Sequence, residues 1–149
     1  SVNSSDTTSR IAFYNGDVLA NGYGYLRNGP ASNTGKRDIY VASEGDKYTT
    51  AVTTTTNPEV ISIGYYGGSG GALTLYTNGT AETLASSTAT VVAPGTALYV
   101  GGANYTGGNG TQPWKGFISE VIIYVRLLKL EERKAVESYL CKKYVIKVS

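Results

Sequence analysis

Five Asn-Gly pairs divide this chain into short pieces, at residues 15–16, 21–22, 28–29, 78–79 and 109–110. Asn and Gly both tolerate a positive φ, which the two-residue turns of β-hairpins require. Between the pairs lie short alternating or β-branched runs, for example RIAFYNG (10–16), EVISIGYY (59–66) and FISEVIIYV (117–125). Seven or more short strands with frequent turns are typical of a β-sandwich or jelly roll, so the sequence predicts an all-β fold.

The length of 149 residues is that of one domain with its own hydrophobic core. The net charge is +2, and between residues 48 and 113 the only charged side chains are Glu59 and Glu82. Nucleic acids are bound by clustered cations, so we expect no nucleic-acid partner. No apolar run is long enough to cross a bilayer, and we expect no membrane insertion.

The C-terminal part of the chain differs from the rest. Acidic residues at 131–132 and basic residues at 142–143 complement the dipole of a helix that begins and ends near them. An apolar stripe recurs there at three- and four-residue spacing, at Val136, Tyr139, Leu140 and Tyr144. The sequence therefore predicts one short C-terminal helix. Residues 121–125, just before it, are apolar on both faces, which predicts a central, buried strand.

The segment KGFISEVIIYVRLLKLEERKAVESYLCKKY (115–144) resembles the ending of laminin-G-like domains of the concanavalin A-like lectin/glucanase superfamily. The matching positions are Gly116, Glu120, Val121, Tyr124, Arg126, Leu128, Glu132, Arg133, Val136, Tyr139, Leu140, Lys143 and Tyr144. Upstream, LTLYTNGT (73–80) and LYVGG (98–102) resemble two of the family's strands, so the resemblance covers residues 60–144. It implies a concanavalin A-like jelly-roll β-sandwich in which the helix covers one edge.

The chain departs from the family's pattern in three places. Lys129 stands where a small polar residue usually caps the helix, and a lysine side chain cannot accept the bond from the helix amides. Val145 replaces the usual Gly after the last Tyr, so we expect the chain to continue as a strand, VIKV (145–148). The family's N-terminal strands are shortened or missing in the single domain, 1–149. Residues 1–47 supply replacement strands, a neighbouring subunit supplies them, or the chain is a fragment.

Two motifs suggest catalysis, and neither is complete. GGSGG (67–71) matches the G-x-S-x-G pattern, but the chain has no histidine and so no Ser-His-acid triad. The glucanases of the concanavalin A-like superfamily carry the motif E-x-D-x-x-E. In this chain Glu44 and Asp46 begin the motif, but Thr49 stands in place of the second Glu. Retaining hydrolysis needs two carboxyl groups. We therefore expect that the protein is not an enzyme.

Cofactor chemistry is similarly restricted. With no histidine and one cysteine, Cys141, the chain has no ligand set for zinc, and we expect that it requires no cofactor. Members of the superfamily that this chain resembles often bind calcium, and calcium takes oxygen ligands. The calcium candidates in this sequence are Glu44 and Asp46.

A Gly-rich loop, GGANYTGGNGTQPW (101–114), has the side chains of a sugar-binding site. Aromatic faces stack on sugar rings, and amides satisfy the hydroxyl groups. The candidate residues are Asn104, Tyr105, Asn109, Gln112 and Trp114. For Trp114 the alternative is core packing. Four Asn-x-Ser/Thr sequons are glycosylation acceptors if the host permits, at Asn3, Asn78, Asn104 and Asn109.

The function expected from the sequence is a non-catalytic carbohydrate-binding or adhesion module of an extracellular, cell-surface or virion protein. Its partners are then glycans or a glycoprotein surface, together with self-association. The alternative is a structural subunit of a viral coat, fibre, filament or surface layer that assembles through the edges of its β-sandwich. Missing strands favour the alternative, because a neighbouring subunit can donate them.

Overall fold

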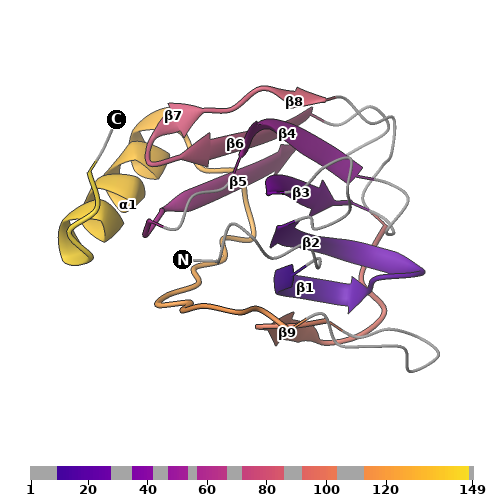
Figure 1. Ribbon diagram of the computed structural model, residues 1–149. Coiled ribbons are helices and arrows are strands. Elements are labelled where there is room, and N and C mark those ends of the chain that lie inside the picture. Colours follow the sequence, from indigo (N-terminus) through magenta and orange to yellow (C-terminus); the bar gives the residue numbers. More distant parts are fainter. Residues whose placement is uncertain are drawn as a thin grey trace.

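The structure is a computed structural model that describes residues 10–27, 35–41, 47–53, 57–66, 72–85, 92–103 and 113–147. These residues form two antiparallel sheets and one helix, which confirms the mostly β fold (Figure 1). The larger sheet has the strand order β8-β4-β3-β2-β1-β9. Its strands are β1 (Arg10–Asp17), β2 (Asn21–Arg27), β3 (Lys36–Tyr40), β4 (Lys47–Thr53), β8 (Leu84–Ala85) and β9 (Leu98–Val100).

The smaller sheet consists of β5 (Ile61–Tyr66), β6 (Ala72–Thr77) and β7 (Thr80–Ala81). Asn78 (φ 51°) and Gly79 (φ 89°) form the turn between β6 and β7. Positive φ at both central residues is the geometry that Asn-Gly favours in a two-residue hairpin. The carboxamide oxygen of Asn78 also accepts a hydrogen bond from the backbone N–H of Val60, at 2.8 Å. The hairpin predicted at this Asn-Gly pair is confirmed.

The Asn-Gly pairs at 15–16 and 21–22 are not turns, contrary to the prediction. Both lie inside paired strands, with Gly16 directly opposite Gly22, and the turn between β1 and β2 falls at residues 18–20. Both glycines have positive φ, 119° and 101°. A Cβ on Gly22 would lie 1.9 Å from the carbonyl oxygen of Asn15. Because these glycines have no Cβ, the two strands can approach each other closely here. The pairs at 28–29 and 109–110 lie outside the described residues.

The main core lies between the two sheets. The larger sheet and the residue after β3 contribute five buried side chains, and β6 contributes Leu75. The five are Ala12, Tyr25, Ile39, Val41 and Tyr48. Partly buried Ile61, Ile63 and Leu73 of the smaller sheet pack against them. Because side chains alternate between the faces of a strand, the larger sheet directs one set of side chains toward the smaller sheet.

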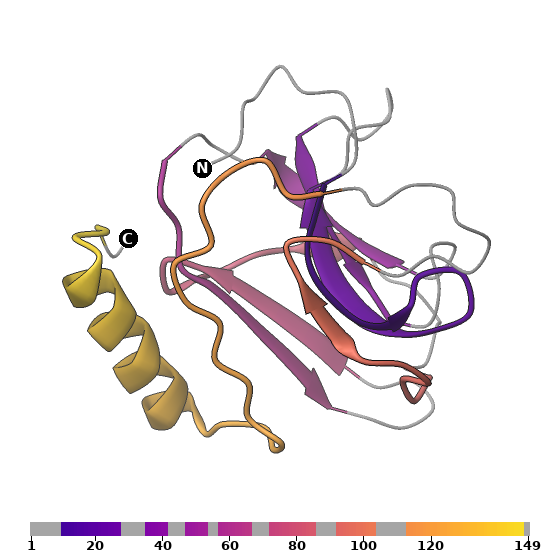
Figure 2. The ribbon, with the colours of Figure 1, turned by 90° about the horizontal axis from the view of Figure 1, so that it is seen from below.

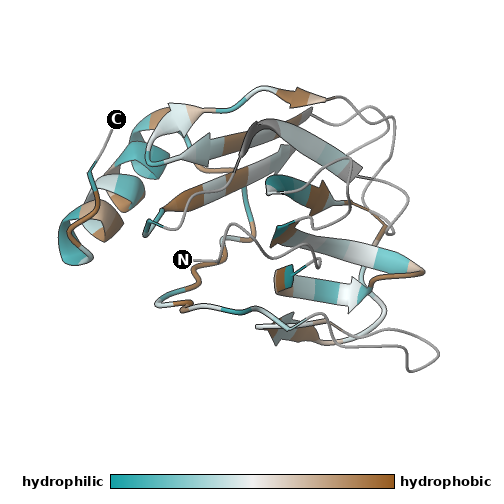
Figure 3. Cartoon of the chain, viewed as in Figure 1, coloured by the Kyte–Doolittle hydropathy of each residue, from teal (hydrophilic) through white to brown (hydrophobic). Residues whose placement is uncertain are grey.

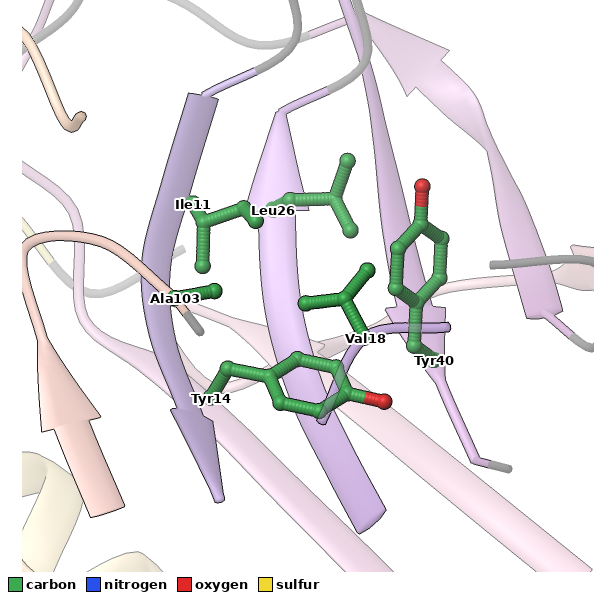
Figure 4. Close-up of a cluster of buried hydrophobic side chains, with 6 residues drawn as sticks. All are labelled: Ile11, Tyr14, Val18, Leu26, Tyr40 and Ala103. Carbon is green, nitrogen blue, oxygen red and sulfur yellow. The ribbon is translucent and has the colours of Figure 1, made fainter. Parts of the chain in front are cut away.

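The opposite face of the larger sheet is also buried (Figure 4). The cluster on this face consists of Ile11, Tyr14, Val18, Leu26, Tyr40 and Ala103. The rings of Tyr14 and Tyr40 meet edge to face, with centroids 6.2 Å apart. Burial, together with the nearby charge of Asp17, raises the pKa of Tyr14 to about 12. Both faces of β1, β2 and β3 are therefore occupied by apolar contacts.

The predicted helix is α1 (Leu130–Lys143), and it packs beside the smaller sheet (Figure 1). Lys129 provides no side-chain cap, as the sequence predicted, and its backbone N–H donates to Glu132 Oε2 at 2.8 Å. The buried residues of the helix are Glu137 and Cys141, whereas Tyr139 of the predicted apolar stripe is half exposed. Val136, Leu140 and Tyr144 of the stripe are partly buried. Arg133, which pairs with Glu137 at 2.6 Å, lies over the ring of Tyr76 in β6.

The predicted last strand, VIKV, does not form over the described residues 145–147. The chain turns instead, because the N–H of Ile146 donates to the carbonyl oxygen of Cys141 at 2.8 Å. The N–H of Val145 donates to the carbonyl oxygen of Lys142 at 3.4 Å. This pair of bonds is the Schellman motif, which ends a helix with one residue in the left-handed region. Val145 is that residue, with a φ of 55°.

The prediction of a central, buried strand at residues 121–125 is wrong. These residues belong to no strand, and all five side chains are exposed. In Figure 2 they are part of an extended trace that leads from the larger sheet to the helix. The apolar pattern indicated extended backbone, but burial also requires neighbouring strands, and no described strand lies in register beside this segment.

Candidate functional site

The predicted sugar-binding loop starts and ends at the edge of the larger sheet. Its first residues are anchored where the N–H of Gly101 donates to the carbonyl oxygen of Ala12, at 2.7 Å. Its last residues are anchored where the N–H of Trp114 donates to the carbonyl oxygen of Gly101, at 3.0 Å. The candidates Asn104, Tyr105, Asn109 and Gln112 lie outside the described residues. The structure thus places the two ends of the loop close together.

Trp114 packs against the core between the sheets. Its ring lies 6.4 Å from that of Tyr25, centroid to centroid, with a tilt of 46° between the planes. The side chain is half buried, and its indole N–H is buried without a hydrogen-bond partner in the described part of the chain. The core-packing alternative for Trp114 therefore describes its position, and the ring joins the loop end to the interior.

The remaining predicted site residues are Glu44, Asp46, Asn3 and Asn78. Glu44, Asp46 and Asn3 lie outside the described residues. Asn78 lies in the β6–β7 turn, where its carboxamide holds Val60. Within the described residues, no group of three or more acidic, cysteine or histidine side chains is placed to hold a metal ion. No helix in this part of the chain has the length and apolarity needed to span a membrane.

The core contains a polar arrangement, the Arg37 cluster, which consists of Arg37, Glu59, Glu82 and Thr77. Arg37 on β3 donates from Nη1 to Glu82 Oε1 at 2.7 Å and from Nη2 to Glu59 Oε1 at 2.8 Å. The hydroxyl of Thr77 donates to the same oxygen of Glu82. The Arg37 and Glu82 side chains are 1% and 4% exposed. One cation of the larger sheet thus binds two carboxylates at the ends of the smaller sheet.

The electrostatics of the Arg37 cluster are those of a structural ion pair. Burial lowers the pKa of Arg37, but the interactions with Tyr25, Glu59 and Glu82 outweigh burial, so that the pKa is raised above its ordinary value. Burial raises the pKa of Tyr25, so its phenol stays neutral. Both carboxylates are bound to the guanidinium rather than to each other. The arrangement offers no free acid and base pair of the kind that glycoside hydrolysis uses.

Sequence reasoning did not predict the Arg37 cluster, although a signal was present. Glu59 and Glu82 are the only charges between residues 48 and 113, and isolated carboxylates among apolar strands need a partner. The partner, Arg37, lies outside that interval. Distance along the sequence concealed the pairing.

The most unusual surface is the 117–127 segment, which comprises residues 117 to 127, FISEVIIYVRL. Phe117 is 87% exposed, Val125 is fully exposed, and the residues from Val121 to Tyr124 are 40–50% exposed. Figure 3 shows hydrophobic residues following one another along this part of the trace. Among the described residues, no backbone group from 117 to 125 is hydrogen-bonded to another backbone group. Within the described part of the chain, the segment is thus a largely apolar run without backbone pairing, and it bends at Val125 and Arg126.

Polar contacts hold the 117–127 segment beside the helix. Glu120 Oε2 accepts hydrogen bonds from Lys143 Nζ at 3.0 Å and from the hydroxyl of Tyr144 at 2.9 Å. Arg126 donates to both carboxylate oxygens of Glu132, at 2.7 and 2.8 Å. The apolar residues between these two anchors remain uncovered.

The same contacts shift the pKa values of the anchoring groups. The Arg126 hydrogen bonds, supported by the backbone N–H of Lys129, lower the pKa of Glu132 to about 2. Hydrogen bonds from Lys143 and Tyr144 lower the pKa of Glu120. Both carboxylates are therefore charged at neutral pH, and the helix and the segment carry paired charges of opposite sign.

Comparison of the chain with protein-family models, with curated proteins and with solved structures gives no match. The function must therefore be argued from the chain's own residues.

Proposed function

We propose that this domain is a non-catalytic structural subunit that assembles with protein surfaces through the 117–127 segment. The observation that carries this proposal is the exposure of an apolar run from Val121 to Val125 that pairs with no other backbone segment among the described residues. Contiguous apolar patches on a protein surface mark interaction sites or aggregation liabilities. Extended backbone without a partner offers a row of donors and acceptors to an incoming strand.

The proposal accounts for features that a self-contained sandwich does not explain. The sequence from 121 to 125 has the pattern of a strand buried on both sides. Pairing with a partner strand would remove apolar surface from water at about 25 cal/mol per Å² and would give the backbone groups on one edge of the segment hydrogen-bond partners. A neighbouring subunit supplies both. The jelly-roll arrangement of laminin-G-like domains is the finer fold that we propose for the assembled state, outside the cell or on a virion.

Carbohydrate binding is the second candidate. It is supported by the anchored ends of the loop between Ala103 and Pro113. The N–H of Gly101 donates to the carbonyl oxygen of Ala12, and the carbonyl oxygen of Gly101 accepts from the N–H of Trp114. A loop fixed at both ends on a sheet edge is a common position for a recognition site. Its amide and aromatic residues suit a neutral sugar, and such binding would accompany assembly. No catalytic role is proposed, because the chain has no histidine and the carboxylates of Glu59 and Glu82 are bound to Arg37.

The test is the mass of the purified chain in solution, measured by light scattering at several concentrations. We expect a dimer or larger species whose fraction rises with concentration. The variant Val125→Ser should lower this fraction because it removes an exposed apolar side chain from the segment. Leu19→Ser is the matched control, since Leu19 is also exposed but lies in the β1–β2 turn. A monomer at every concentration would contradict assembly through self-association.

A further inference from the structure

We propose that the partner of the 117–127 segment is the same segment of a second copy, paired antiparallel with Ile123 opposite the partner's Ile123. This inference rests on the proposed assembly function and specifies its partner and register. It makes the interface a two-fold one, in which each copy contributes the same residues.

Opposite charges stand at the two ends of the apolar run in the segment. The sequence from 120 to 126 is EVIIYVR, with an acid at one end, a base at the other and five apolar residues between them. Antiparallel pairing centred on Ile123 places Glu120 opposite the partner's Arg126, at both ends of the pairing. Oppositely charged residues directly across a strand pair attract. A parallel, in-register pair would instead place Glu120 against Glu120, and like charges in that position are destabilising.

The apolar residues of the two segments also face one another. In this register Val121 faces the partner's Val125, and Ile122 faces the partner's Tyr124. Pairs of β-branched residues, and pairs of an aromatic with a β-branched residue, are favourable across antiparallel strands. Shifting the register by one residue places Glu120 against an apolar neighbour. Of the registers of this antiparallel pair, only the one centred on Ile123 places Glu120 opposite Arg126.

The ion pairs within each chain continue across the proposed pairing. Glu120 is bonded to Lys143, and Arg126 is bonded to Glu132. Across the interface, the order of charges is Lys143, Glu120, the partner's Arg126 and the partner's Glu132, so that the signs alternate. All of these side chains keep solvent exposure in the single chain and are accessible to a partner. Exposed ion pairs are weak individually, but networks of alternating charge contribute more.

Cysteine cross-linking of the full chain tests the register. Directly opposed residues in an antiparallel pair have Cα atoms about 4.5–5.5 Å apart, within the range that a disulfide spans. Ile123→Cys should therefore form a disulfide-linked dimer under mild oxidation. Ile122→Cys and Tyr124→Cys should each cross-link at least about ten times more slowly alone, but rapidly when the two variants are mixed. The native chain is the control, because Cys141 is buried and should not react.

The outcomes separate this inference from the proposed function. Fast cross-linking of Ile123→Cys, together with the Ile122→Cys and Tyr124→Cys mixture, supports the register. Equal cross-linking by all three variants overturns it, as does a native chain that is dimeric while Ile123→Cys keeps free thiols; in both cases assembly itself stands. A native chain that is monomeric throughout contradicts assembly as well. Circular dichroism of each variant checks that its fold is intact. The mass of the native chain is a test of assembly that does not depend on any variant.

Discussion

The backbone N–H of Ile146 donates to the carbonyl oxygen of Cys141 at 2.8 Å, closing a turn that places Val145 in the left-handed region with a φ of 55°. Glycine is the usual residue at this position of a Schellman motif because it has no Cβ. Val145 is β-branched, so its backbone is strained in the left-handed region. Its side chain is 92% exposed and gains no packing that would offset this strain. Val145, which stands where the laminin-G-like pattern usually has glycine, is thus at a position where the backbone favours glycine.

Val145→Gly should therefore stabilise the protein, by about 1 kcal/mol, because the left-handed conformation costs a residue with a Cβ about that much. Val145→Ala, which keeps the Cβ but removes the branch, should gain clearly less. Urea unfolding followed by circular dichroism measures both. A Val145→Gly variant less stable than the native chain would contradict the strain described at this turn.

A series of three glycine substitutions should separate steric clash from backbone strain. Gly22→Ala places a Cβ 1.9 Å from a carbonyl oxygen at positive φ and should cost about 3 kcal/mol or more. Gly101→Ala has positive φ but open space and should cost about 1 kcal/mol. Gly102→Ala has neither and should stay within about 0.5 kcal/mol of the native chain. The prediction fails if thermal or urea unfolding gives any other order of stability.

Arg37→Leu should destabilise the fold by about 3–5 kcal/mol, because it leaves Glu59 and Glu82 buried without a compensating charge. Arg126→Leu is the matched control, since it breaks an ion pair that is exposed to solvent, and its effect should be much smaller. Replacing all three members of the cluster, Arg37, Glu59 and Glu82, with leucine should recover part of the loss. Denaturant unfolding measures each variant. Equal losses for Arg37→Leu and Arg126→Leu would show that the cluster is not buried in solution.

The attachment of the helix should weaken at acid pH. The pKa of Glu132 is lowered from 4.5 to about 2 in the folded chain, so the folded state binds the proton less readily than the unfolded state. The Glu132–Arg126 contribution to stability is therefore complete above about pH 4.5 and is lost as the pH falls toward 2. The shift of Glu120 has the same sign. Thermal midpoints of the native chain and of Glu132→Gln, measured between pH 7 and pH 2.5, should converge as the pH falls. A difference that does not change with pH would contradict this prediction.

Some elements of the fold are predictable from the sequence because their causes are local. The Asn78-Gly79 turn needs only the φ preferences of two residues, and the structure has the hairpin there. Helix α1 was predicted from its terminal charges, which its own dipole favours. Gly16 and Gly22 carry the same Asn-Gly signal but lie opposite each other inside strands. That outcome depends on which strands meet, which the dipeptide does not specify.

The candidate site was harder to predict because its chemistry depends on neighbours. Trp114 was weighed between sugar binding and core packing, and its contact with Tyr25 places it against the core. The pattern of residues 121–125 indicated extended backbone but could not specify whether a partner covers it. The Arg37 cluster joins residues 22 and 45 positions apart, and no local pattern contains that information.

The same separations bear on the order of folding. Strands β1 to β4 pair with one another in sequence order, as do β5 to β7, so each group can form through short loop closures. Strands β8 and β9 join the larger sheet at its two edges. Arg37 belongs to the first group, while Glu59 and Glu82 flank the second. The cluster can therefore be completed only when the two groups meet, and substitutions in it should change the unfolding rate much more than the folding rate. A kinetic chevron for Arg37→Leu would then mark the docking of the two sheets as the late step in folding.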